Sequence, residues 1–143
     1  MKIGILGIKA RSTTPWCIHA MTALRHLNPQ VEFWTPDDDA WDDINWTSGD
    51  AVQPIVDGIT RRQVEGISSC TALLVHLDSS EAGLGARLEL GRILMTEGLR
   101  IHVVLSPDLM GRHYIRSHYP FARATVTEHA TLDEAVTAIA AAA

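Results

Sequence analysis

The sequence predicts an α/β fold in a single domain: a doubly wound, five-stranded parallel sheet with helices on both faces. Short β-rich runs alternate with segments of helical periodicity along the whole 143 residues, and this alternation is the pattern of parallel strands joined by crossover helices. The three central runs are almost continuously apolar, as expected of strands buried on both faces. A chain of this length most economically forms one hydrophobic core.

Each element has a local reason in the sequence. The chain opens on the apolar strand KIGILG, and Pro15 suits the first turn of the helix that follows. Later apolar runs such as ALLVHL and IHVVLS read as buried strands, and Thr131 with Glu134 forms a capping box that begins the last helix. We expect strands at 2–7, 31–34, 72–77, 101–106 and 123–128, and helices at 15–27, 57–68, 84–97, a weaker 110–117, and from 132 into the alanine tail.

Right-handed crossovers give these strands the order 2-1-3-4-5, which is that of flavodoxin-like and Rossmann-like sheets. Ligands of such sheets bind beyond the carboxyl ends of the strands, where the strand order reverses. The reversal falls between the first and third strands, so GIKARSTTPW and LDSSEAGLGARLE are expected to meet at one crevice. These are also the two chemically richest loops of the chain.

The first loop has the composition of an anion or phosphate site. Gly7 permits close backbone approach, Lys9 and Arg11 are cations, and Ser12 begins a run of hydroxyl side chains before a helix. Helix N-terminal amides and arginine both favour negative oxygens. The alternative is an ordinary Ser/Thr-rich helix cap with solvated basic neighbours.

The second loop carries glycines and two acids. Gly83 and Gly85 relax the backbone next to a ligand, and Glu89 follows about one turn into the helix that they open. Asp78 ends the third strand, where acids of such sheets bind ligand hydroxyls or cap the next turn. Two acids on one crevice resemble the pair of carboxylates with which enzymes cleave a glycosidic bond. The alternative is that Glu89 only stabilises its helix.

The stretch CTALLVHLDSSEAGLGARLELGRILMTEGLRIHVVLSPD resembles the core of the nucleoside 2-deoxyribosyltransferase family and of the related deoxynucleoside 5′-monophosphate N-glycosidases. The shared features are an apolar strand ending near an acid, a glycine-containing loop, Glu89-Leu90-Gly91, and a further buried strand. The resemblance implies that Glu89 is the nucleophile that takes the 2-deoxyribosyl group, and that Asp78 holds the sugar or base. It also implies that the loop from Gly7 to Ser12 receives the 5′ end of the substrate.

Two departures from the family pattern bear on specificity or activity. An acid expected on the helix before the third strand is replaced by Gln63, which can position water or substrate but cannot act as a base. Arg87 replaces a small residue two places before the glutamate, where it either crowds the site or pairs with a phosphate. The cations Lys9 and Arg11 favour a 5′-phosphate over a bare hydroxyl, and so a nucleotide substrate and hydrolysis.

Composition excludes several other classes of function. The net charge of −5, with acids gathered in TPDDDAWDDINW, argues against a nucleic-acid polymer as partner. No apolar run approaches the roughly 20 residues of a membrane span, and the N-terminus lacks a signal-peptide pattern, so we expect a cytoplasmic protein. Cys17 and Cys70 read as reduced thiols, and the histidines 102, 113, 118 and 129 lack metal-ligand spacing. We therefore expect neither a metal nor a cofactor.

Exposed apolar residues and the long loop leave further expectations. Leu88, Met95 and Leu99 lie away from the core stripe of their helix, which predicts a homodimer or larger homo-oligomer. The long connection from Thr35 to Pro54 is expected to be a functional loop whose tryptophans cover a ligand, or else a solvated loop packed on the body. The competing function is a non-catalytic, flavodoxin-like nucleotide or flavin binding module, because RSTT follows the first strand.

Overall fold

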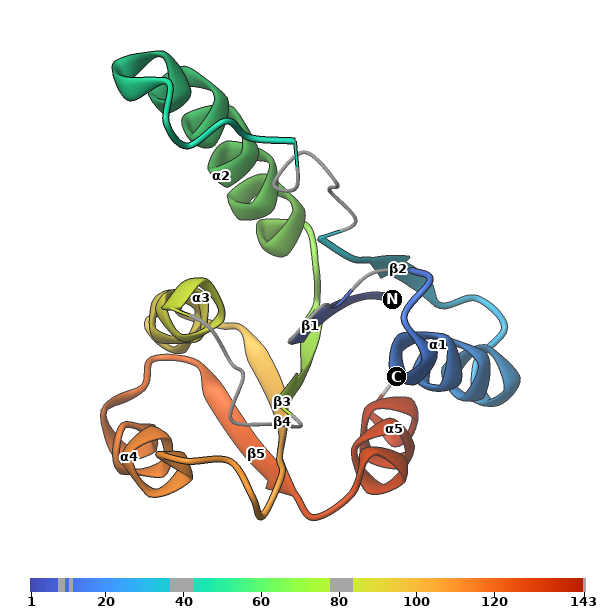
Figure 1. Cartoon of the computed structure of the whole chain (residues 1–143). Helices are drawn as coiled ribbons and strands as arrows, with labels where there is room; N and C mark the ends of the chain where they lie inside the picture. The colour runs from blue at the N-terminus through green and yellow to red at the C-terminus, as the bar shows by residue number, and fades with distance from the viewer. Residues whose placement is uncertain (8–9, 11, 37–42, 78–83, 143) are drawn as a thin grey trace.

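The chain folds into a five-stranded parallel sheet whose strand order is β2-β1-β3-β4-β5. The computed structural model, drawn in Figure 1, describes residues 1–7, 10, 12–36, 43–77 and 84–142. This result confirms the predicted fold class and the predicted strand order. The strands are β1 Lys2–Gly7, β2 Glu32–Trp34, β3 Ala72–Leu77, β4 Arg100–Leu105 and β5 Thr125–His129, and the helices are α1 Pro15–Leu27, α2 Gln53–Ser68, α3 Leu84–Leu94, α4 Arg112–Ser117 and α5 Leu132–Ala141, with 3-10 turns η2 Gly49–Val52 and η3 Tyr119–Phe121.

Helices cover both faces of the sheet (Figure 1). On one face α1 and α5 pack together, and Leu24 and Ile139 bury their side chains there against Leu74 of β3. On the other face, Ile67 of α2 and Ile93 of α3 join the alternate residues of the same strands. Because β3 and β4 are covered on both faces, their residues are buried almost without interruption.

Helix α2 extends away from the strands, with its C-terminal end nearest to the sheet (Figure 1). At that end Gly66 lies against the indole of Trp34, and a Cβ atom at Gly66 would fall 2.1 Å from Trp34 Nε1. A glycine is therefore required for this approach, although glycine weakens a helix interior. The contact fixes the end of α2 that leads into β3.

Several details differ from the sequence expectations. Helix α2 begins at Gln53 and not at residue 57, because Pro54 takes a position in the first turn, where the missing amide hydrogen costs nothing. Helix α3 ends at Leu94, three residues before its predicted end at residue 97. The prediction that Leu99 lies away from the core is wrong: it packs in the core below α3, just before β4 begins.

The last helix has the predicted cap. Thr131 Oγ1 accepts a hydrogen bond from the backbone amide of Glu134 at 3.2 Å. In return, the Glu134 carboxylate accepts one from the amide of Ala130 at 3.0 Å. Among the helices drawn from the described residues, none combines the length and apolarity needed to cross a lipid bilayer.

Candidate functional site

The carboxyl ends of β1 and β3 lie side by side at the point where the strand order reverses. Leu6 pairs with Val75 and Gly7 pairs with His76, in parallel register. The chain then leaves β1 toward α1 on one face and leaves β3 toward α3 on the other. Connections that separate in this way open the crevice in which ligands of α/β sheets bind.

Gly7 allows the two strand ends to approach each other closely. Its φ is 155°, and a Cβ atom there would lie 2.1 Å from the carbonyl oxygen of His76 and 3.0 Å from Cζ2 of Trp16. Any other residue at this position would push the strand ends apart. The backbone carbonyl of Gly7 accepts a hydrogen bond from the amide of Ala10 at 3.3 Å.

Trp16 and His76 form an aromatic wall beside Gly7, on the α1 face of the sheet. Their ring centroids are 4.9 Å apart and the rings are nearly perpendicular, at 81°. The Nε1 of Trp16 is buried and finds no hydrogen-bond acceptor within the part of the chain that is described. The sequence had offered Trp16 only as a ring that could flank a flavin in the competing interpretation, and it did not indicate His76, because only the pairing of Gly7 with His76 brings the two rings together.

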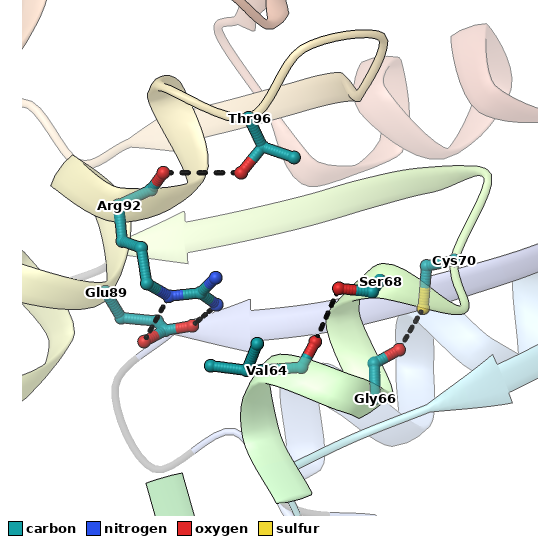
Figure 2. A network of polar contacts seen from close by, with 7 residues as sticks. All are labelled: Val64, Gly66, Ser68, Cys70, Glu89, Arg92 and Thr96. Atoms are coloured by element: carbon teal, nitrogen blue, oxygen red, sulfur yellow. Dashed lines mark hydrogen bonds and ion pairs between the residues drawn. The ribbon is translucent and has the colours of Figure 1, made fainter. Parts of the chain in front are cut away.

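Glu89 and Arg92 form an ion pair on the other side of the sheet (Figure 2). Both side chains extend from α3 in the direction of α2, and 22% of the Glu89 side chain is exposed. Arg92 Nε lies 3.4 Å from Glu89 Oε2, and Arg92 Nη2 donates to Glu89 Oε1. The three-residue spacing places the pair on one flank of α3, because residues three apart are neighbours on a helix.

Gln63 lies on α2, on the same side of the sheet as Glu89. It is four residues from both Ile59 and Ile67, which are buried, so it belongs to the helical face that points to the body of the protein. Gln63 itself is half-buried. It is a polar group on the helix toward which Glu89 and Arg92 extend.

The remaining residues predicted for the site fall into two groups. Lys9, Arg11, Asp78 and Gly83 lie outside the described residues. Ser12 is exposed in the turn before α1, while Gly85 and Arg87 belong to the first turn of α3. Gly85 therefore has helical backbone, and its predicted conformational freedom is not used there.

A second polar pair lies away from the crevice, between β4 and β5. His102 Nδ1 and His129 Nε2 are 3.0 Å apart, and the two rings stack with 12° between their planes. Burial lowers the pKa of His102 from 6.5 to about 4, and the charges of His129 and Arg100 act in the same direction. Within the described ranges, no three His, Cys, Asp or Glu side chains gather as metal ligands.

Comparisons with known proteins support the fold alone. No protein-family model matches the chain, and no curated protein matches it. A crystal structure of a conserved protein from Enterococcus faecalis V583 is similar, with a TM-score of 0.64 and 13% sequence identity, over 100% of this chain and 99% of that one. At this identity the likeness shows a shared α/β architecture from end to end.

Proposed function

We propose that this protein cleaves or transfers at the N-glycosidic bond of a (deoxy)ribonucleoside or its 5′-monophosphate, with Glu89 as the nucleophile. The observation that carries the proposal is the half-buried carboxylate of Glu89, held by Arg92 on the first half of the helix that follows β3. That helix is the element after β3, and ligands of such sheets bind at the carboxyl ends of strands such as β1 and β3. The enzyme is proposed to act in the cytoplasm on small molecules.

Arg92 holds the two oxygens of Glu89 unequally. Arg92 Nη2 donates to Oε1, whereas the contact of Nε with Oε2 is 3.4 Å, near the limit of a hydrogen bond. Oε2 is therefore the oxygen more available to attack the anomeric carbon. Arg92 would fix the orientation of the carboxylate through the other oxygen.

The proposed reaction has two steps. An oxygen of Glu89 bonds to the anomeric carbon as the bond from that carbon to the base breaks, and the base leaves with the electron pair and takes up a proton. Water or a second base then attacks the same carbon and releases Glu89. In this scheme Asp78 holds the sugar or base, Gln63 positions water or substrate, and the turn from Gly7 to Ser12, with Lys9 and Arg11, receives the 5′ end.

Base release is the direct test. The protein is incubated with a panel of deoxynucleosides and their 5′-monophosphates, and free base is followed by chromatography. Glu89→Gln should lower release by at least about a thousandfold because it removes the nucleophile. Glu97→Gln, the same change at an exposed acid beyond the end of α3, should leave release unchanged. Unchanged release in Glu89→Gln would exclude this residue, and no release by the wild type from any substrate would favour a binding role.

We also propose that the protein self-associates as a homodimer or larger homo-oligomer. Leu88 and Met95 of the α3 region are exposed, as expected for side chains that a second copy would cover. Leu99, which the sequence also predicted to lie away from the core, is buried and does not contribute.

A further inference from the structure

An apolar groove of about 270 Å³ lies on the outer side of α3, between that helix, α4 and η3. It is a separate feature from the flank of α3 that carries Glu89 and Arg92. No residue of its lining is Asp, Glu, Lys or Arg, and such depletion of charge is typical of the buried centre of a protein interface. The lining residues are Leu90, Gly91, Leu94, Met95, Met110, Gly111, Tyr114, Ile115, His118 and Phe121.

Large apolar side chains stand exposed at the groove and beside it. Leu88, Met95, Met110, Tyr114 and Phe121 are between 54% and 77% exposed. With about 200 Å² for a large side chain, these five present roughly 700 Å². This area is close to the roughly 800 Å² that each partner buries in a stable protein interface. A small molecule in the groove would leave most of it in water.

Gly91 is the unusual residue of the groove. It lies inside α3, where glycine is less stable than alanine, yet a Cβ atom there would meet nothing within 4 Å. Gly111 on the opposite side also has open space around it, but its φ of 85° is itself a reason for a glycine. Packing among the described residues therefore does not require a glycine at position 91. Its absent side chain leaves room for an atom from outside the chain.

We propose that this groove is the docking site of a second copy of this chain, in a two-fold symmetric contact. The patch holds both a groove and protruding side chains, so that each copy can insert a side chain such as Phe121 or Met110 into the groove of the other, as an isologous interface requires. One charge beside the patch is already paired: Arg116 on α4 contacts Glu128, with Nε 3.0 Å from Oε1 and 2.9 Å from Oε2. The inference specifies the self-association proposed above and does not depend on the glycosidic chemistry.

The test compares two groove variants with two matched controls by size-exclusion chromatography with light scattering, at micromolar concentration. Gly91→Leu fills the groove, and Phe121→Asp places a charge on the patch. Gly58→Leu is the control for the first, because Gly58 is also inside a helix and its nearest atom to a Cβ is 3.8 Å away. Ile18→Asp is the control for the second, since Ile18 is an exposed apolar residue of α1. Circular dichroism establishes that each variant is folded.

The wild type and both controls should be dimers, and both groove variants should raise the dimer dissociation constant by at least about tenfold. Should Gly91→Leu fail to fold, Phe121→Asp carries the test. A monomeric wild type would overturn the proposal. It would do so even if the groove of that monomer bound a hydrophobic dye or another protein. Dimers that persist unchanged in Phe121→Asp, or that Ile18→Asp disrupts equally, would place the interface elsewhere and overturn it as well. Base release is measured separately, so that the two proposals fail independently.

Discussion

Alanine at Gly66 tests how tightly α2 is fixed to the sheet. The new Cβ atom would lie 2.1 Å from both Cε2 and Nε1 of Trp34 and 2.5 Å from Cζ2, whereas non-bonded carbon atoms approach to about 3.5 Å. The indole or the helix must therefore move by more than about 1 Å. Overpacking of this kind costs about 1–3 kcal/mol, against about 0.5–1 kcal/mol gained by replacing a helical glycine with alanine. We expect Gly66→Ala to destabilise the protein by about 1–2 kcal/mol.

The same substitution elsewhere on α2 should have the opposite sign. At Gly58 the nearest atom to a new Cβ is 3.8 Å away, which is ordinary contact, so Gly58→Ala should stabilise the protein by about 0.5–1 kcal/mol. Urea unfolding followed by circular dichroism measures both changes. Replacing Trp34 with leucine in the Gly66→Ala background should recover part of the loss, because the crowded ring is then gone. Equal effects of alanine at the two glycines would refute the packing argument.

Two further predictions concern residues outside the candidate site. The lowered pKa of His102 means that, as the pH falls, the unfolded chain takes up a proton at this residue before the folded protein does. The free energy of unfolding should therefore fall by up to about 3 kcal/mol as the pH drops from 6.5 to about 4. Urea unfolding at pH 7 and pH 4.5 should show a smaller loss of stability in His102→Asn than in the wild type, and an equal loss would contradict the lowered pKa of His102. Thr131→Ala should cost about 1 kcal/mol because it removes the cap of α5. Thr22→Ala, at an exposed position inside α1, is its control in thermal unfolding and should differ little from the wild type.

The fold followed from local sequence patterns to a large extent. Apolar runs and helical periodicity predicted the strands and helices, and right-handed crossovers predicted the strand order. The boundaries of β1, β3 and α1 agree with prediction to the residue. The error at Leu99 lies where a tertiary contact decides. Leu99 has the spacing of an exposed helical position, but α3 ends at Leu94, and the chain then turns Leu99 into the core.

The candidate site was only partly predictable from the sequence. Glu89 and Arg92 stand three residues apart, so their pairing was available from helical spacing alone. The contact of Trp16 with His76 was not, because it joins residues 60 positions apart through the register of β1 with β3. His102 and His129 likewise meet only because β4 and β5 pair in a particular register.

Helix α3 connects the two proposals, because its surfaces have three different uses. Leu90, Ile93 and Leu94 face the sheet and are buried. Successive residues are rotated by about 100° on a helix, so that Glu89 and Arg92 lie on one flank of this stripe and Gly91 and Met95 lie on the other. A second copy seated on the outer flank would hold α3 against the sheet without touching Glu89. Phe121→Asp changes that contact from η3 and alters no residue of α3. If base release falls in this variant in step with the loss of dimer, association fixes the orientation of Glu89. If the monomeric variant releases base at an unchanged rate, α3 is held in place by its own core contacts.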